Sequence, residues 1–393
     1  MKNLSAMNKN INLGYLLGFL RACWFWLGVW VFYYLMFTDY AGIGLLESVM
    51  IITWILMEIP TGALSDLLGK KKALILAFLL LGFGNIVMGG AVSFFTLGLG
   101  IFIGSIGLAF FSGTHEAFLY DTLKSHGQTS KFDEVIGKTN SFNQLGMAVG
   151  GIFSGVLYAI SPQLPFFLVG IFGLIGAVIS IFLDEPKVDS ERFSLKQFIE
   201  QNKSGVKQLK ELLKTVSIMP IIFGVASVWV ISDEMLESVL AVEYGFSPQL
   251  IGPFFALLFL ISAGASTLTP TLNRRFKINT LLIVLGLVLA VSYIVSPFVG
   301  ILFGGVMMIL RESIMRIFNN GASIVINNHT SSNIRVTTLS TFSMVKNLPY
   351  AAVAFFMGAW MDKITSQWVA FNLGSGLAVA LLMYWAITRF RKV

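Results

Sequence analysis

Charged residues are scarce in this chain: Asp, Glu, Lys and Arg make up 12% of its 393 residues, whereas hydrophobic residues make up 56%. A typical soluble domain carries about 25% charged residues, because much of its surface faces water. A water-soluble fold of this size could not bury so many apolar side chains. The composition therefore excludes a soluble globular protein and predicts that most of the chain is surrounded by lipid.

The sequence is also poor in cysteine and histidine, with one Cys and three His residues. Cys23 lies inside the first apolar run and has no partner for an intrachain disulfide, so we interpret it as a small core residue. The scattered histidines give no metal-ligand cluster, and the chain has neither a phosphate-binding loop nor a nucleophile–base pairing. These absences predict that the protein is not an enzyme and has no cofactor or metal.

The formal net charge is +7, which in a soluble protein would suggest a nucleic-acid partner. In a membrane protein the charge has to be interpreted by position, because cytoplasmic loops collect Lys and Arg. If both termini are cytoplasmic, most of the 27 basic residues fall in inner segments, and the outer loops hold only Lys363. This asymmetry predicts a multi-pass protein of the inner (cytoplasmic) membrane, with both termini in the cytoplasm and no nucleic-acid partner.

Long apolar runs dominate the sequence, and a spanning helix needs about 20 mostly apolar residues. The first run, Ile11 to Phe37, is too long for the core of a signal peptide and lacks a small-residue cleavage site, so we expect a retained transmembrane helix. Twelve spans are predicted, at 12–37, 41–64, 73–92, 95–119, 139–160, 164–183, 217–240, 248–271, 279–297, 299–317, 337–360 and 367–388. The predicted fold class is an all-α integral membrane protein with twelve transmembrane helices.

The longest polar stretch, 184–216, divides these spans into six and six. Its apolar side chains between 195 and 213 fall largely on one helical face, which predicts an amphipathic helix lying along the inner membrane surface. Weak similarities between the halves suggest two related bundles. We therefore expect an N-terminal six-helix bundle over 1–183, a cytoplasmic linker over 184–216, and a pseudo-symmetric C-terminal six-helix bundle over 217–393.

A polar segment follows the second predicted span: Gly62-Ala-Leu-Ser-Asp66-Leu-Leu-Gly69-Lys70-Lys71. It resembles the loop signature of the major facilitator superfamily, G-x-L-x-D-x-x-G-R/K-R/K, between the second and third helices. Gly62 allows a neighbouring helix to approach closely, and Gly69 permits a turn conformation that side chains disfavour. Asp66 is suited to accept hydrogen bonds from a nearby helix N-terminus, and the lysines favour a cytoplasmic loop. The resemblance implies a cytoplasmic gating element.

The fifth predicted span carries a second resemblance, to the antiporter signature of the same superfamily, G-x8-G-x3-G-P-x2-G-G. This sequence has Gly151 where proline is expected and Ser154 where glycine is expected. The glycines concerned are Gly137, Gly146, Gly150, Gly151 and Gly155. The resemblance implies an exporter, and the alternative is that small residues at this spacing simply allow tight helix packing.

The fourth predicted span departs from one branch of the superfamily. The drug–proton antiporters carry an arginine in the middle of this helix, whereas the stretch from Gly100 to Gly107 has none. The end of the span, from Ser112 to Asp121, resembles a bacterial group of facilitators whose loop signature has the form E-x-P-T-G-x-x-x-D. In its layout the whole chain nevertheless resembles twelve-helix bacterial facilitators of the drug/proton antiporter type.

Ionisable side chains inside spans cost about 2.5–3.5 kcal/mol each on insertion scales, so each one needs a reason. In the superfamily, helices one, four, seven and ten line a central cavity, and most of the intramembrane charges of this chain fall on those helices. The candidates for substrate binding or proton coupling are Arg21, His115, Glu116, Asp233, Glu234, Arg311 and Arg316. As alternatives, His115 is a packed helix-end residue, Arg316 pairs with Glu312 one turn earlier, and Glu47 and Glu237 are hydrated near the outer surface.

Among these candidates, we expect Glu116 and the Asp233/Glu234 pair to share the work of coupling. Carboxyl groups moved from water into a low-dielectric interior bind protons more readily. Arg21 and Arg311, on facing helices, are expected to pair with these carboxylates and keep them ionised until substrate or a proton displaces the pair. The alternative is that these groups form fixed structural ion pairs.

The residues and the resemblance together predict a monomeric secondary active transporter that uses the proton gradient to export small amphipathic or cationic compounds by alternating access. Its expected partners are a small-molecule substrate, protons and the lipid bilayer. One alternative is an uptake carrier for a small anionic nutrient bound by Arg21 and Arg311. A second alternative is a membrane receptor or assembly subunit that transports nothing.

Overall fold

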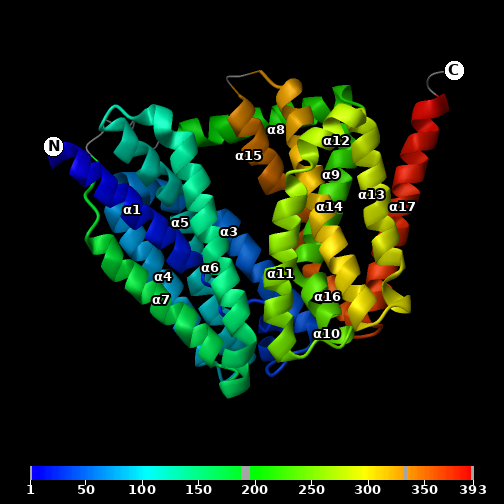
Figure 1. Cartoon of the computed structure of the whole chain (residues 1–393), viewed down its shortest axis with the longest axis horizontal. Helices are drawn as coiled ribbons and strands as arrows, with labels where there is room; N and C mark the ends of the chain where they lie inside the picture. The colour runs from blue at the N-terminus through cyan, green and yellow to red at the C-terminus, as the bar shows by residue number, and fades with distance from the viewer. Residues whose placement is uncertain (1, 187–194, 332–333, 391–393) are drawn as a thin grey trace. The chain divides into compact units, whose positions relative to one another are not determined.

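The computed structural model describes residues 2–186, 195–331 and 334–390, and their regular secondary structure is entirely helical. Figure 1 shows the helices. They are α1 (Lys2–Ala22), α2 (Trp30–Tyr34), α3 (Tyr40–Leu68), α4 (Lys70–Gly89), α5 (Phe94–Lys124), η1 (Thr129–Lys131), α6 (Phe132–Ile160), α7 (Leu164–Ile181), α8 (Leu195–Thr215), α9 (Met219–Ile231), η2 (Ser232–Leu236), α10 (Glu237–Glu243), α11 (Pro248–Ser266), α12 (Thr269–Arg275), α13 (Ile278–Ile294), η3 (Ser296–Phe298), α14 (Ile301–Asn328), α15 (Arg335–Val345), α16 (Leu348–Met361) and α17 (Ser366–Phe390). The predicted all-α fold class is confirmed.

Each of the twelve predicted spans is occupied by one helix or by helices in series. Eight segments of the described chain are long and apolar enough to cross a membrane, and α12 with α13, bent by 118°, would make a ninth. The three other predicted spans contain breaks or charges: α1 and α2 are separated by a turn, α15 and α16 are separated at Lys346, and α14 carries two arginines and a glutamate. Breaks and charges lower the apolar length of a helix, and in transport proteins they mark functional positions.

Contacts divide the chain into two compact units. The first unit comprises Met1–Thr38, Val49–Phe198 and Pro248–Ala256, and the second comprises Asp39–Ser48, Ile199–Ser247 and Leu257–Val393. The first residues of α3 thus belong to the second unit, and the first residues of α11 belong to the first. The boundaries expected from the sequence, at 183 and 217, stay a prediction.

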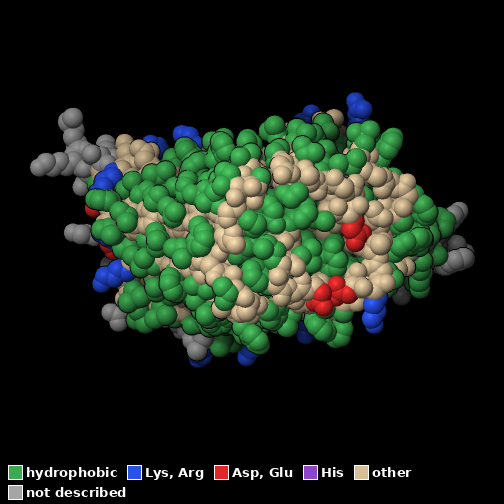
Figure 2. Space-filling model, turned by 90° about the horizontal axis from the view of Figure 1, so that it is seen from below, with side chains coloured by type: hydrophobic (Ala, Val, Ile, Leu, Met, Phe, Trp, Pro, Cys, Tyr) green, Lys and Arg blue, Asp and Glu red, His purple; other side chains and the backbone are tan. Residues whose placement is uncertain are grey.

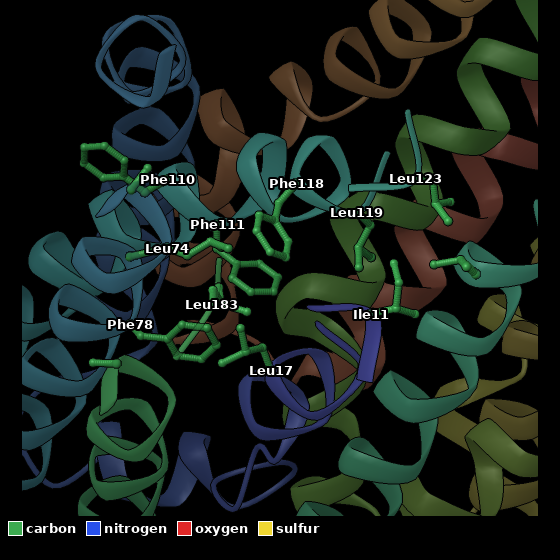
Figure 3. Packing of buried hydrophobic residues seen from close by; sticks show 14 of the residues in the cluster. Ile11, Leu17, Leu74, Phe78, Phe110, Phe111, Phe118, Leu119, Leu123 and Leu183 are labelled. Carbon is green, nitrogen blue, oxygen red and sulfur yellow. The ribbon is translucent and has the colours of Figure 1, made fainter. Parts of the chain in front are cut away.

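The first unit is built on α4, which packs against both α5 and α7. Glycines allow these helices to approach backbone to backbone: a Cβ atom on Gly84 would lie 2.5 Å from the amide nitrogen of Gly104, and one on Gly82 would lie 2.9 Å from the carbonyl oxygen of Gly170. Close approach through small residues is the usual means of helix association in lipid. Figure 3 shows the hydrophobic cluster beside this contact, where Phe78, Phe111 and other side chains of α1, α4 and α5 pack together.

Helix α1 is fastened to the end of α7 by polar contacts. The Asn10 side chain donates to the carbonyl oxygen of Asp184 at 2.8 Å and accepts from the Asp184 amide at 2.9 Å, while the Lys9 ammonium pairs with the Asp184 carboxylate at 3.1 Å. The amide of Asn10 thereby satisfies backbone groups beyond the end of α7 that the helix itself cannot pair.

In the second unit, the first residues of α3 pack against α16. A Cβ atom on Gly44 would collide with the backbone of Ala354, so this contact also depends on glycine. The Asp362 carboxylate accepts hydrogen bonds from the amides of Tyr40 and Ala41, both at 2.9 Å, and so caps the N-terminus of α3. A carboxylate is stabilising at that end of a helix because the helix dipole is positive there.

Helix α8 occupies the stretch for which the sequence predicts an amphipathic helix; its Leu209 and Leu212 are buried and its Lys203 is exposed. Its position along the membrane surface stays a prediction.

Large hydrophobic side chains are widely exposed on the surface of the protein, with Phe95 84% and Leu302 73% accessible. Figure 2 shows one face of the molecule, on which hydrophobic side chains predominate and acidic ones are few. Such a surface suits a lipid solvent.

Candidate functional site

The loop between α3 and α4 is held by Glu185. Its carboxylate accepts hydrogen bonds from the amides of Lys70 and Lys71, at 2.7 and 2.8 Å, and so caps the N-terminus of α4. Gly69 has φ of +89°, a conformation that favours glycine, and a Cβ atom there would lie 3.0 Å from the Glu185 carboxylate. Gly69 is therefore needed both for the turn and for the cap.

Asp66 makes a different contact from the one expected. The sequence suggested that it would accept hydrogen bonds from a helix N-terminus, but Glu185 takes that position at α4. The Lys70 ammonium instead lies 3.5 Å from the Asp66 carboxylate and 3.0 Å from that of Asp121 on α5. Lys70 thus bridges two carboxylates across the first unit, and the gating role of this segment stays a prediction. The sequence signal for Glu185 was the acidic pair directly after the sixth span.

Four of the five signature glycines of α6 are packing positions. A Cβ atom on Gly146 would lie 2.5 Å from the carbonyl oxygen of Phe19, and one on Gly150 would lie 2.7 Å from the backbone of Trp24. On the other side, Gly151 and Gly155 approach the backbone at the start of α11, whereas Gly137 has open space around it. This arrangement supports the packing interpretation of the signature, and the exporter interpretation stays a prediction.

Arg311 is the most fully engaged charged residue of the second unit. Its guanidinium lies 3.0 Å from the Glu237 carboxylate, 2.6 Å from the Ser296 hydroxyl and 2.8 Å from the carbonyl oxygen of Ser292, and its Nε atom donates to the Ser292 hydroxyl at 3.2 Å. The ring of Tyr293 covers it at 4.5 Å. Arg311 is 1% exposed, so these contacts tie α10, α13 and α14 together as a structural centre.

Arg316, one turn and a half further along α14, forms the expected i,i+4 pair with Glu312. Two nitrogens of its guanidinium each lie 2.8 Å from one Glu312 oxygen. The Glu312 side chain is 6% exposed and that of Arg316 is 41% exposed. This carboxylate is therefore buried but neutralised.

Asp233 and Glu234 lie together in η2, a π-helical turn between α9 and α10. Neither makes a hydrogen bond or ion pair with another residue of the described part of the chain, although both interact electrostatically with Lys346. Lys346 lies in the break between α15 and α16, with its ammonium 5.7 Å from the centre of the Trp229 ring. Lys346 is not among the candidates predicted from the sequence; a lone lysine in an apolar span was the available signal.

Two further carboxylates belong to this region, and the expectation that they are hydrated is wrong. Glu47 and Glu237 are only 6% and 8% exposed. Glu47, on the part of α3 that belongs to the second unit, interacts electrostatically with Glu234. In this charged cluster the acidic residues outnumber the basic ones; the members are Glu47, Asp233, Glu234, Glu237, Glu312, Arg311, Arg316 and Lys346.

The excess of carboxyl groups over cations in this cluster favours the binding of protons. With more carboxyl groups than cations, full ionisation would leave uncompensated negative charge in a low-dielectric interior, and a bound proton relieves that excess. Among the described residues, no group of three or more His, Cys, Asp or Glu side chains is arranged to bind a metal ion.

Four of the charged side chains without an ion pair in the described chain lie where helices are irregular, whereas Glu47 and Glu116 lie within the continuous helices α3 and α5. Arg21 lies in the last turn of α1, just before the break to α2; Asp233 and Glu234 lie in the π-turn; Lys346 lies between two helices. The paired residues Arg311, Glu312 and Arg316 lie within the continuous helix α14. π-turns and discontinuous spans are common at functional sites, because they place polar groups where a regular helix would not.

The remaining candidates lie in the first unit. Glu116 is exposed on α5, about two turns before its end, and makes no hydrogen bond or ion pair with another described residue. His115 is buried; its Nε2 lies 2.9 Å from the carbonyl oxygen of Gly14, and its ring stacks on Phe111. A carbonyl can only accept, so Nε2 donates this bond. The geometry favours the packed-residue interpretation of His115.

Comparison with known proteins assigns the family. Residues 15–347 match the model of the Major Facilitator Superfamily. An uncharacterized MFS-type transporter of Methanocaldococcus jannaschii, MJ1560, is 23% identical over 82% of this chain and 78% of its own length. Multidrug resistance protein 1 of Bacillus subtilis is 24% identical over 47% of each chain, and quinolone resistance protein NorA of Staphylococcus aureus is 26% identical over 56% of each.

Solved transporter structures share the fold. A mutant of the nucleoside transporter NupG superposes with a TM-score of 0.80 at 15% identity, over 95% of this chain and 99% of that one. A POT family transporter bound to 5-aminolevulinic acid gives a TM-score of 0.70 at 12% identity, over 97% and 95% of the two chains. At these identities the likeness concerns the fold alone. The match of the family model covers most of the chain, which therefore belongs to the major facilitator superfamily, a family of transporters rather than enzymes.

Proposed function

We propose that this secondary transporter exports small amphipathic compounds, cationic ones included, in exchange for protons. The observation that carries the proposal is a contrast within the charged cluster. Arg311 and Arg316 each pair with a carboxylate, whereas Asp233 and Glu234 have no ion-pair partner among the described residues. Distant relatives named for multidrug and quinolone resistance support the export direction and the substrate class.

Competition at Asp233 and Glu234 gives a mechanism for exchange. When ionised, these carboxylates attract Lys346 and can also bind a cationic substrate; when protonated, they do neither. A proton and a cationic substrate therefore exclude one another at the same groups, which is the requirement for antiport. Glu116 offers a second free carboxylate in the first unit, and we propose that it binds the proton at another stage of the cycle.

The structure weakens the alternative of an anion carrier that uses both arginines. Arg311 already contacts Glu237, Ser292 and Ser296, so it has little hydrogen-bonding capacity left for a substrate. Arg21 alone retains that capacity. The alternative of a receptor that transports nothing is separated from both carriers by measuring flux.

Proteoliposomes test the proposal. With purified protein in vesicles, an imposed pH gradient should drive ethidium, an amphipathic cation, against its concentration gradient, and dissipation of the pH gradient should stop it. The same measurement with a panel of neutral and anionic compounds defines the substrate class. Failure of the pH gradient to drive any compound of the panel would contradict proton-coupled transport.

Replacing Asp66 with Asn should slow transport strongly and leave the fold intact. The substitution removes one of the two carboxylates bridged by Lys70, while the pair with Asp121 and the Glu185 cap remain. The Lys70 and Asp66 side chains are only 12% and 25% exposed, but their contact is long at 3.5 Å and Lys70 keeps its closer pair with Asp121. We therefore expect Tm in detergent to change by less than about 4 °C. Ethidium flux in proteoliposomes measures the effect.

The matched control is Glu134→Gln. Glu134 and Lys138 form an i,i+4 pair at 2.7 Å near the start of α6, outside the loop signature. Loss of this ion pair should leave ethidium flux unchanged. Equal flux in the Asp66→Asn variant and the wild type would count against the proposed gating role.

We propose that the protein lies in the inner membrane of the cell, with both termini in the cytoplasm. Single cysteines introduced by Gln128→Cys or Lys203→Cys, in a Cys23→Ala background, should react with an impermeant maleimide only from the cytoplasmic side. The native Cys23 is 0% exposed, so its removal chiefly lowers background labelling. Labelling of either site from outside would overturn this orientation.

A further inference from the structure

Arg21 is held in an unusual way for an intramembrane arginine. Its guanidinium carbon lies 5.4 Å from the centre of the Trp24 ring and 5.4 Å from that of the Phe111 ring. Within the described chain it has neither a carboxylate partner nor a hydrogen-bond acceptor. It is also partly exposed, whereas Arg311 is 1% exposed. Arg311 is thus neutralised by a carboxylate, whereas Arg21 is left without an ion-pair partner in the described chain.

Aromatic contact leaves the hydrogen-bonding capacity of Arg21 unused. A guanidinium has five N–H donors in its plane, and the attraction to a ring involves the charge of the group rather than these donors. The position of Arg21 in the last turn of α1 compensates part of its charge through the helix dipole. Its planar edge remains available, and the matching ligand is a carboxylate, which takes two parallel N–H bonds.

Other polar atoms without partners lie in the same region. The indole nitrogen of Trp26, whose ring stacks on Trp24 at 5.3 Å, is buried and makes no hydrogen bond with a described residue. The same holds for the side-chain oxygen of Asn143 on α6. A Cβ atom on Gly18 would lie 2.7 Å from that oxygen and 3.6 Å from the His115 ring, so Asn143 and His115 face the same stretch of α1.

The spacing along α1 connects these observations. Gly18 and Arg21 are three residues apart and lie on one helical face, which Gly14 also shares. The two glycines admit His115 and Asn143 close to α1, and Arg21 follows them with Phe111 against its guanidinium. Figure 3 shows Phe111 among the packed side chains of this region, so its ring is held in place.

We propose that Arg21, flanked by Trp24 and Phe111, is a binding subsite for the carboxylate of an aromatic or similarly flat amphipathic substrate. Arg21 supplies the charge and the paired donors, and the two rings supply apolar surface beside them. The proposal rests on the transport function proposed above and extends its substrate class to compounds with an acidic group, zwitterions included. All of these residues belong to the first unit.

A pair of uncharged and anionic probes tests the subsite. Binding of 2-naphthoate and of its neutral analogue 2-naphthamide to the full-length protein in detergent is measured by calorimetry, without any gradient. The wild type should bind the carboxylate about 10- to 100-fold more tightly, as expected for charge-assisted hydrogen bonds. Arg21→Gln should remove this preference, and Arg21→Lys should retain part of it, because lysine keeps the charge but not the paired donors.

A control variant and a stability measurement separate loss of the subsite from a general loss of structure. Arg274→Gln, at an exposed arginine near the end of α12, should keep the full preference for the carboxylate. Arg21→Gln should also keep a Tm close to that of the wild type, because Arg21 contacts two rings but has no ion-pair or hydrogen-bond partner among the described residues. Equal binding of both probes by the wild type, or an unchanged preference in Arg21→Gln, would overturn the subsite. Neither result would bear on pH-driven flux, which tests the transport proposal separately.

Discussion

Neutralising Asp233 and Glu234 together, by Asp233→Asn and Glu234→Gln, is expected to reduce pH-gradient-driven ethidium transport to background. The two amides keep the size of the side chains but cannot bind and release a proton. Exchange of labelled for unlabelled substrate should continue, because it needs alternating access without net proton movement. If Glu116 takes the proton at another stage of the cycle, Glu116→Gln is also expected to abolish gradient-driven transport and to leave exchange intact. Both activities are measured in the same proteoliposomes.

A control for this prediction is Glu211→Gln, which removes an exposed carboxylate of α8 outside the charged cluster. It should leave both driven transport and exchange unchanged. If the doubly neutralised variant still concentrates ethidium with the pH dependence of the wild type, Asp233 and Glu234 do not couple transport to protons. If exchange is lost as well, the pair serves binding or conformational change rather than coupling.

Replacing Arg311 with Met is expected to have the largest effect on stability. The change leaves Glu237 buried without its cation, and breaking a buried pair in this way costs about 3–5 kcal/mol. For a unit of roughly 200 residues, that corresponds to a fall in Tm of about 10 °C or more. Thermal unfolding in detergent measures the effect.

Removing both partners should reverse much of that loss. The Arg311→Met, Glu237→Met double variant leaves neither member of this pair as a buried charge without its partner, and apolar replacements of buried pairs are often tolerated. Arg21→Met should keep Tm within about 4 °C of the wild type, because Arg21 has no ion-pair partner in the described chain. An unchanged Tm in Arg311→Met, combined with lost transport, would show instead that Arg311 serves the substrate.

The fold followed from the sequence because the bilayer imposes one dominant rule. Backbone groups in lipid must pair within a helix, so each apolar run of sufficient length had to be a span. The places where prediction was incomplete are the ones where helices break: the turn after Ala22, the π-turn at Ser232 and the interruption at Lys346. Those irregularities depend on tertiary packing and leave no periodic pattern in the sequence.

The candidate site could be predicted only as a set of residue types. The cost of intramembrane charge singled out Arg311 and Asp233 equally, because one sequence does not show which carboxylate reaches which cation. The structure distinguishes them: Arg311 contacts Glu237, which lies 74 positions earlier in the chain, while Asp233 has no ion-pair partner among the described residues. Glu312 with Arg316 was predictable because an i,i+4 spacing on one helix brings the two side chains together by itself.

Contacts between distant segments account for the other omissions. Glu185 caps α4 across 115 positions, and Glu47 reaches the cluster because the first part of α3 packs with the second unit. The acidic pair after the sixth span marks Glu185 as a polar position, but nothing near either residue in the sequence shows which distant segment it contacts. The capped N-terminus of α4 could be expected from the sequence, but the residue that caps it could not.

The central claim, that Asp233 and Glu234 exchange a proton for substrate, is tested most directly by reversing the driving force. Coupling is reciprocal, so an outward ethidium gradient across proteoliposomes without a pH gradient should drive protons inward, and a trapped pH indicator should report acidification. The account predicts this signal for the wild type and its absence in the Asp233→Asn, Glu234→Gln variant. Ethidium movement without any proton movement in the wild type, or an undiminished proton signal in the variant, would contradict it.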